Sequence, residues 1–209
     1  MHAAAARRVV LATGNPGKLR EFAELLGPLG IELLPQSRFG IEPPEETGET
    51  FVANALLKAR HAAARSGLPA MADDSGLEVD ALGGAPGVRS ARYAGEGAGD
   101  AANVAKLLAA LRNVDAATRG ARFRCVIALV RTADDPAPLL GSGCWEGRIL
   151  PAARGSGGFG YDPVFAPSGE VRSVAELTAT EKHAQSHRGA ALRDLLARWP
   201  ATEAAAQRP

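Results

Sequence analysis

Cysteine is scarce in this chain: only Cys125 and Cys144 occur among its 209 residues. Both lie in runs that are typical of strands, and two cysteines supply neither a disulfide framework nor a zinc site. We therefore expect a reducing, cytoplasmic environment. Neither cysteine has the electropositive neighbours that activate a thiolate, and no serine stands in a Gly-x-Ser-x-Gly elbow. The sequence thus gives no indication of nucleophilic catalysis by cysteine or serine.

Long apolar runs and an excess of one charge are also absent. No stretch approaches the roughly 18 apolar residues that a membrane span needs, and the first residues lack the apolar core of a signal peptide. The 24 basic and 23 acidic residues leave a formal net charge of +1, without a basic run. We therefore expect neither a membrane nor a polymeric nucleic acid as partner. A small anionic ligand held by a few local cations remains compatible with this balance.

The alternation of apolar and polar segments predicts an α/β fold with a mixed sheet. We expect one domain over residues 7–200, with flexible termini at 1–6 and 201–209. Strands are expected at 8–12, 31–34, 68–72, 77–80, 121–132, 139–149 and 164–166, and helices at 19–26, 50–65, 100–111 and 186–199. Segments 121–132 and 139–149 form an antiparallel hairpin around the turn at 134–136.

Two adjacent carboxylates, Asp73 and Asp74, follow the apolar run 68–72, and Ser75-Gly76 is typical of a turn. Carboxylates at the end of a strand are hard oxygen ligands that suit Mg²⁺. A metal there can neutralise phosphate oxygens and lower the pKa of a bound water. The same residues also fit a polar turn that merely ends a strand. The pattern alone leaves both interpretations open, and with them the question of whether Asp73 is a ligand.

Residues 13–18, Thr-Gly-Asn-Pro-Gly-Lys, join a strand to a helix. Two glycines permit close backbone approach, the helix N-terminus offers N–H groups, and Lys18 adds a full charge. This predicts an anion-binding loop, although the spacing is neither that of a P-loop nor that of a dinucleotide site. A plain strand–turn–helix corner fits the pattern equally well.

Helix 50–65 carries Asn54, Lys58 and His61 on one face of an otherwise alanine- and leucine-rich segment. Such a polar stripe is usually the solvated side of a helix. Alternatively it lines a cleft, with Lys58 directed at phosphates and Glu46 near the aspartate pair. Both interpretations stay open.

Two later segments could recognise a nucleobase. In 157–163, Gly-Gly-Phe-Gly-Tyr-Asp-Pro, glycines flank Phe159, whose ring could stack on a base or simply fill the core. Lys182, His187 and Arg188 form a donor cluster near the start of the last helix. Cations at a helix N-terminus oppose its dipole, which favours a ligand beside them, although solvation is the simpler reading.

These segments together resemble the inosine triphosphate pyrophosphatase family. The matching motifs are Ala12-Thr-Gly-Asn-Pro-Gly-Lys18, Glu46-Thr-Gly with Thr50-Phe51, Asn54-Ala and Lys58-Ala, Ala72-Asp-Asp-Ser-Gly-Leu77, Gly83-Gly-Ala-Pro-Gly87 with Ser90-Ala-Arg-Tyr93, Gly157-Gly-Phe-Gly-Tyr-Asp-Pro163, and Ser186-His-Arg188. They occur in family order over nearly the whole chain, which makes the resemblance specific.

The resemblance implies a role for each matching residue. Thr13, Gly14, Asn15 and Lys18 would bind the triphosphate, Glu46 and Asp74 would ligate Mg²⁺, and Asp74 would also be the general base. Ser75 would contact the substrate, Phe159, Gly160, Tyr161 and Asp162 would hold base and sugar, and Lys182, His187 and Arg188 would complete the base pocket. Pro16, Gly17 and Asn54 are further candidate substrate contacts, and Lys18 and Lys58 are candidate catalytic cations.

The family fold is an elongated α/β homodimer subunit with a long central mixed sheet, two lobes and the active site in the cleft between them. The implied activity is Mg²⁺-dependent hydrolysis of ITP, dITP and XTP to the monophosphate and pyrophosphate, which cleanses the nucleotide pool. The alternatives are a nucleotide pyrophosphatase that prefers modified pyrimidines and a nucleotide-binding module without catalysis.

Overall fold

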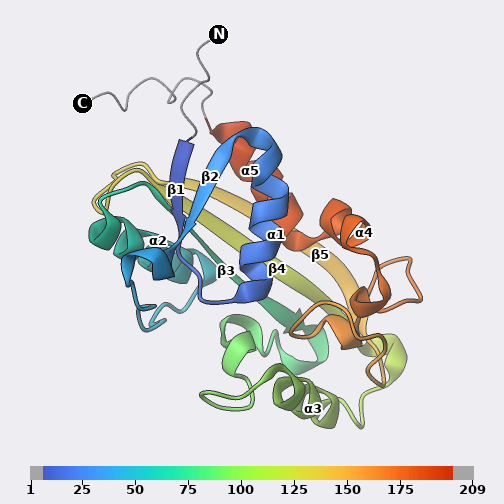
Figure 1. The fold of residues 1–209 in the computed structure, drawn as a ribbon. Helices are drawn as coiled ribbons and strands as arrows, with labels where there is room; N and C mark the ends of the chain where they lie inside the picture. The colour runs from blue at the N-terminus through green and yellow to red at the C-terminus, as the bar shows by residue number, and fades with distance from the viewer. Residues whose placement is uncertain (1–6, 200–209) are drawn as a thin grey trace. The chain divides into compact units, whose positions relative to one another are not determined.

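The computed structural model describes residues 7–199 (Figure 1). The predicted flexible termini, 1–6 and 201–209, lie outside the described residues. The strands are β1 (Arg7–Leu11), β2 (Ile31–Pro35), β3 (Ala70–Val79), β4 (Gly120–Val130), β5 (Leu139–Ile149) and β6 (Phe165–Pro167). The α-helices are α1 (Pro16–Leu26), α2 (Phe51–Ser66), α3 (Asp100–Ala110), α4 (Ala179–Gln185) and α5 (His187–Arg198), with short 3₁₀ turns between elements. No helix in this part of the chain is long and apolar enough to cross a membrane.

The described strands form one mixed sheet in the order β2-β1-β3-β4-β5-β6. Strand β1 pairs in parallel with both β2 and β3, whereas β5 and β6 are antiparallel. Helices α1 and α2 lie in the connections from β1 to β2 and from β2 to β3. The connection from β4 to the neighbouring β5 is short enough only for a hairpin. The predicted α/β fold with a mixed sheet is confirmed.

The described chain divides into two compact units, each with a core of its own. The first unit comprises residues 7–74, 126–142 and 191–199, and the second comprises 75–125 and 143–190. We refer to them as the first and second units. They agree with the expectation of two lobes, while the elongated shape and the cleft stay predictions.

The core of the first unit is built from small side chains on α2. Ala55, Ala59 and Ala62 are fully buried and belong to the same apolar cluster as Val10 of β1 and Val130 of β4. Local signals set the ends of α2: the Thr50 side chain caps its N-terminus, and Gly67, with φ of 66°, ends it. Alanine on the buried face lets the helix backbone lie close to the sheet, which brings the polar residues of α2 near the strands.

The core of the second unit is richer in aromatic residues. Phe123, Trp145, Tyr161 and Phe165 are buried there with aliphatic residues from β3 and α3. Phe123 and Phe165 have ring centroids 4.6 Å apart in a tilted arrangement, a geometry that aromatic pairs favour.

One helix start and one turn were predicted wrongly, and one helix was not predicted. Helix α1 begins at Pro16 rather than Leu19, because Asn15 caps it and proline suits the first helical turn. The expected turn at Ser75-Gly76 is absent, since β3 continues without interruption to Val79. The expected helix 186–199 is confirmed as α5 to within one residue at each end, but a separate helix, α4, which was not predicted, precedes it, and the extended backbone of Ser186 separates the two.

Candidate active site

The two aspartates lie just beyond the end of a neighbouring strand. Strand β1 pairs with β3 through Val10 with Ala70 and Leu11 with Met71, and β1 then ends. Strand β3 continues, so Asp73 and Asp74 follow directly after this pairing. Both are buried, with 1% and 5% of their surface exposed. The end of β1 therefore brings the loop that follows it next to the two carboxylates.

That loop begins a helix and places a lysine on the first aspartate. The Asn15 side chain accepts hydrogen bonds from the backbone N–H groups of Gly17 (2.8 Å) and Lys18 (3.2 Å), and the Thr13 hydroxyl accepts one from the Asn15 N–H (3.1 Å). Lys18 Nζ lies 3.0 Å from Asp73 Oδ2. The predicted anion-binding loop is thus an exposed helix N-terminus, with Lys18 anchored by a buried carboxylate.

Lys58 joins two acidic side chains from different segments. Its Nζ lies 2.7 Å from Glu46 Oε1 and 2.8 Å from Asp74 Oδ1. Lys58 is only 9% exposed although it stands on a helix. The face of α2 that carries Lys58 is therefore directed into the protein, and the solvated-stripe interpretation does not hold for this residue.

Asn54 lies one helical turn before Lys58 and is fully buried. Its Oδ1 accepts a hydrogen bond from the Gly48 N–H (2.8 Å), and its Nδ2 donates one to Asp74 Oδ2 (3.2 Å). Asn54 was predicted to contact substrate. In this structure both ends of its amide are hydrogen-bonded within the protein.

Burial and charge shift the proton affinities of this cluster. Burial disfavours the charged form of Lys58, but the carboxylates of Asp74, Asp73 and Glu46 outweigh it and raise the Lys58 pKa. Burial also raises the pKa of Asp74, against the opposing effect of the Lys58 ammonium. A carboxylate whose pKa is raised accepts a proton more readily than an exposed one.

Two carboxylates of the same cluster fit a divalent cation. Glu46 and Asp74 each place an oxygen within reach of one ammonium nitrogen, so the two oxygens are close together in a place that already favours positive charge. Within residues 7–199 no group of three or more acidic, histidine or cysteine side chains could hold a metal. Two carboxylates fit Mg²⁺, because it usually keeps several waters and takes further ligands from substrate phosphates.

In the second unit, Asp162 organises the glycine-rich loop around Phe159. Its Oδ2 accepts hydrogen bonds from the Phe159 N–H (2.9 Å) and from Lys182 Nζ (2.8 Å). Gly158 has φ of 73°, and a side chain there would collide with the Asp162 carboxylate. The loop conformation thus depends on glycine at this position.

The Phe159 ring is partly exposed and faces two cations. Lys182 Nζ lies 4.6 Å and Arg188 Cζ 5.8 Å from the ring centroid, within the range of cation–π attraction. Tyr161, not Phe159, fills the core, and its hydroxyl donates to the Ser90 carbonyl (2.9 Å). Of the two interpretations of Phe159, the structure favours an available ring over a core plug.

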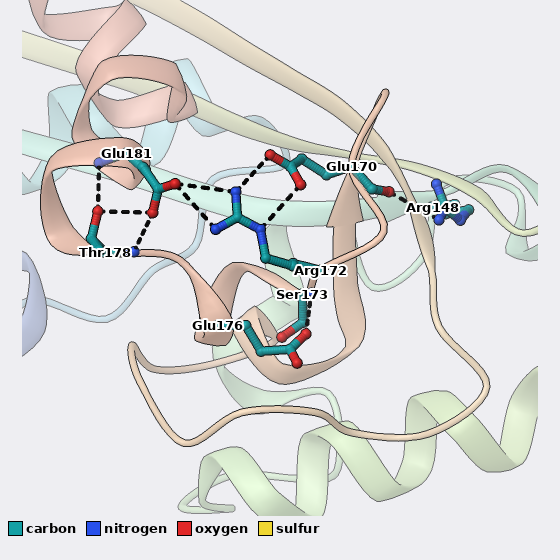
Figure 2. Close-up of polar contacts among 7 residues, drawn as sticks. All are labelled: Arg148, Glu170, Arg172, Ser173, Glu176, Thr178 and Glu181. Carbon is teal, nitrogen blue, oxygen red and sulfur yellow. Dashed lines mark hydrogen bonds and ion pairs between the residues drawn. The ribbon is translucent and has the colours of Figure 1, made fainter.

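A capped helix holds Lys182 in place (Figure 2). Thr178 and Glu181 form a capping box at the start of α4, with hydrogen bonds in both directions. The Arg172 guanidinium bridges Glu181 and Glu170, at 3.1 and 2.9 Å. Figure 2 shows Arg172 between the two carboxylates, so the loop before α4 is tied to the first turn of the helix that carries Lys182.

His187 and Arg188 are buried at the start of α5 rather than solvated. The His187 ring stacks on Phe123, with centroids 4.8 Å apart and an interplanar angle of 11°. Arg188 is 1% exposed, and its Nη2 donates to Ser75 Oγ at 3.2 Å. Ser75 directly follows Asp74 in the chain. Both side chains therefore lie within the fold and not on a solvated helix face.

The structure gathers the predicted residues into two sets. In the first unit the linked residues are Glu46, Asn54, Lys58 and Asp74. Lys18 contacts Asp73, the residue before Asp74, and Thr13 and Asn15 shape the adjoining loop. In the second unit, Phe159, Asp162 and Lys182 are in contact, and Arg188 reaches both Phe159 and Ser75.

One contact of this site was not predicted from the sequence. The Asp100 carboxylate accepts a hydrogen bond from the Gly160 N–H at 2.7 Å and so holds the loop next to Phe159. Sixty residues separate Asp100 from Gly160, so no local pattern in the sequence indicates the contact.

The chain is similar to known proteins over most of its length. A model of the Ham1 family matches residues 9–198. A dITP/XTP pyrophosphatase of Thioalkalivibrio sulfidiphilus is 58% identical over 191 residues, covering 91% of this chain and 97% of the relative. A HAM1 protein structure from Coxiella burnetii superposes with a TM-score of 0.84 at 52% identity, covering 91% of this chain and 97% of that one.

A second solved structure extends the comparison to a more distant relative. It is described as a nucleoside-triphosphatase and dITP/XTP pyrophosphatase from Mycobacterium abscessus, with 44% identity and a TM-score of 0.70, over 92% of this chain and 98% of that one. Sequence and fold thus match over nearly the full length. The chain belongs to the Ham1 family.

Proposed function

We propose that this chain hydrolyses the non-standard purine nucleoside triphosphates dITP, ITP and XTP to the monophosphate and pyrophosphate. The observation that carries the proposal is the ammonium of Lys58 held between the carboxylates of Glu46 and Asp74, where the preceding residue, Asp73, contacts Lys18 in the first turn of α1. The names of the curated relatives, dITP/XTP pyrophosphatases, support the same activity.

The first unit supplies the groups for the triphosphate. The positive end of the α1 dipole and the charge of Lys18 attract phosphate oxygens, and Asp73 keeps Lys18 in position. Glu46 and Asp74 would hold Mg²⁺, which supplies charge neutralisation and lowers the pKa of a bound water. Lys58 balances the two carboxylates and stays charged.

Asp74 is the general base in this proposal. Its carboxylate accepts a proton from the attacking water, whose oxygen forms a new bond to phosphorus at the anhydride between the α- and β-phosphates. The old P–O bond breaks, and pyrophosphate leaves. Phosphoryl chemistry of this kind depends on positioning and charge neutralisation rather than on covalent help from the protein. The cluster provides both, since Lys58 and Asn54 fix the base between them.

The second unit supplies the groups for the base. Phe159 offers a ring for stacking, while Lys182, His187 and Arg188 are donors that pair with the 6-oxo group of hypoxanthine and xanthine. Adenine presents a 6-amino donor there and would leave those groups unpaired. Such mismatches of buried polar groups give rejection of about 10⁴-fold. In this proposal these donors separate 6-oxo purines from adenine, whereas guanine, which also has a 6-oxo group, differs from hypoxanthine only at its 2-amino position.

The finer features of this role are also proposals. We expect dependence on Mg²⁺, a homodimer and action in the cytoplasm on the nucleotide pool. The deciding experiment incubates the protein with ITP, XTP, dITP, GTP, ATP and modified pyrimidine triphosphates, with and without Mg²⁺, and resolves the products. IMP and pyrophosphate are expected from ITP. Orthophosphate and IDP as the main products, or tight ITP binding without turnover, would contradict the proposal.

A further inference from the structure

Asn54 is a buried polar residue in a helix whose other inward positions are mostly alanine. A side-chain amide costs free energy to bury unless its donors and acceptor are satisfied. The burial of Asn54 on an apolar face is explained by the two hydrogen-bond partners of its amide.

The partners fix which way the amide points. The backbone N–H of Gly48 can only donate, so the atom that faces it at 2.8 Å is the acceptor Oδ1. The donor Nδ2 consequently faces Asp74 Oδ2 at 3.2 Å. The amide thus connects the backbone of one segment to the carboxylate of another, with a defined direction.

The segment on the acceptor side is the one that carries Glu46. Gly48 lies so close to α2 that a Cβ there would come within 2.5 Å of Asn54 Oδ1 and 2.8 Å of the Ala53 Cβ. Only glycine fits this approach. Asn54 therefore fixes the backbone two residues from Glu46, while Lys58 contacts the Glu46 side chain.

Asp74 is held at both oxygens by the same face of α2. Lys58 Nζ donates to Oδ1 at 2.8 Å, and Asn54 Nδ2 donates to Oδ2 at 3.2 Å. Two donors one helical turn apart determine the plane of the carboxylate, which neither could do alone. A base that is already held in the reactive orientation gives a faster reaction than one that samples unreactive orientations.

We propose that Asn54 is a positioning residue that orients Asp74 for proton abstraction and holds the Glu46 segment beside it. The inference rests on the proposed function, in which Asp74 is the general base. Asn54 acts through Asp74 and does not contact the substrate.

The substitution Asn54→Asp separates the two contacts. It keeps an acceptor for the Gly48 N–H but replaces the donor to Asp74 by a second carboxylate. We expect kcat for ITP to fall about 100-fold, the scale of a misplaced catalytic group, with little change in KM. If Asn54 only stabilises the fold, kcat of the folded Asn54→Asp protein should equal that of the wild type.

Asn103 offers a matched control. It is also buried, its Oδ1 accepts from the Ala94 N–H (2.7 Å), and its Nδ2 donates to the Ala91 carbonyl (3.1 Å), with no carboxylate as partner. Asn103→Asp makes the same chemical change in another buried amide. We expect it to lower the melting temperature and to leave kcat of the folded protein unchanged.

The exchanged pair Asn54→Asp with Asp74→Asn adds a readout besides activity. It restores one donor and one acceptor between the two positions, so the melting temperature, which Asn54→Asp alone should lower, should largely return. Turnover should be absent in the pair, because position 74 no longer carries a base. Wild-type kcat in Asn54→Asp, or an equal loss of kcat in Asn103→Asp, would overturn the positioning role alone. A wild-type protein that releases no pyrophosphate from ITP would overturn the proposed function and this role with it.

Discussion

Lys58 Nζ lies within hydrogen-bonding distance of both Glu46 and Asp74, so one buried ammonium neutralises part of the charge of two carboxylates. The pair of acids is stable inside the protein because this cation stands between them. The two carboxylates and one ammonium together keep a net negative charge, which favours a further cation nearby.

The substitution Lys58→Met tests whether the Lys58 ammonium stabilises the two buried carboxylates. Lys58→Met should lower the free energy of unfolding by about 3–5 kcal/mol, the usual result of leaving one side of a buried ion pair uncompensated. Mg²⁺ should restore part of the loss, because two close carboxylates without the lysine bind a divalent cation. Thermal unfolding with and without Mg²⁺ measures both effects. Arg65→Met, which removes an exposed cation from the same helix, should change stability little, with no response to Mg²⁺.

Asp74→Asn tests the proposed base. The amide is close to isosteric but cannot accept the proton, so kcat should fall by roughly 10²–10⁴-fold, as general bases typically contribute. Circular dichroism should show an unchanged fold. Asp134→Asn, an exposed aspartate in the turn between β4 and β5, serves as the control and should keep full activity. Activity near the wild-type level in Asp74→Asn would exclude this residue as the base.

Phe159→Ala tests stacking on the base. Aromatic stacking contributes about 1–3 kcal/mol per base, so KM for ITP should rise by roughly 5–150-fold while kcat changes little. Phe159→Tyr keeps the ring and should retain the wild-type KM. Steady-state kinetics with both variants decides the matter. A fall in kcat at constant KM would instead place the ring at the reacting phosphates.

Asp135 gives a prediction for stability against pH. Its two oxygens accept hydrogen bonds from the Arg131 side chain and backbone and from the Ala137 N–H, and the Arg131 side chain holds the pKa of Asp135 well below its usual 3.8. Because the folded pKa is lowered, the stabilisation is complete above the unfolded pKa and is lost as pH falls through the folded one.

Asp135→Asn should therefore cost about 1.5–3 kcal/mol at pH 7, the range for hydrogen bonds to charged groups. The difference from the wild type should shrink as pH falls below 3.8. Urea unfolding at several pH values measures this, with Asp134→Asn as the control in the same turn. A difference that is constant down to acid pH would show that ionisation of Asp135 does not contribute.

Hydrophobic pattern and capping residues predicted most of the fold. Thr50 and Gly67 located α2 to within one residue, and strand 139–149 was predicted with its observed ends. The predicted family resemblance is also confirmed. The wrong start of α1 and the missed helix α4 could both have been avoided from local sequence. Asn15-Pro16 is a typical helix start, and Thr178 with Glu181 has the pattern of a capping box at the start of α4.

Other features depend on contacts between distant segments, so no local sequence pattern predicts them. Ser75-Gly76 has the composition of a turn, yet pairing within the sheet keeps β3 extended there, a tertiary effect that overrides propensity. The contact of Asn54 with Asp74 joins residues twenty positions apart. The sequence showed that Asn54 was unusual, but only the fold shows which partner explains it.

The first unit is drawn from both ends of the described chain, since it contains residues 7–74 as well as 191–199. Helix α5 supplies buried Leu192 and Leu195, and its backbone lies so close to Gly141 of β5 that no side chain fits between. During translation this helix leaves the ribosome after every other described element. The segments that carry Lys18, Lys58 and Asp74 are thus synthesised early, but the unit that contains them cannot finish its core until α5 has been made.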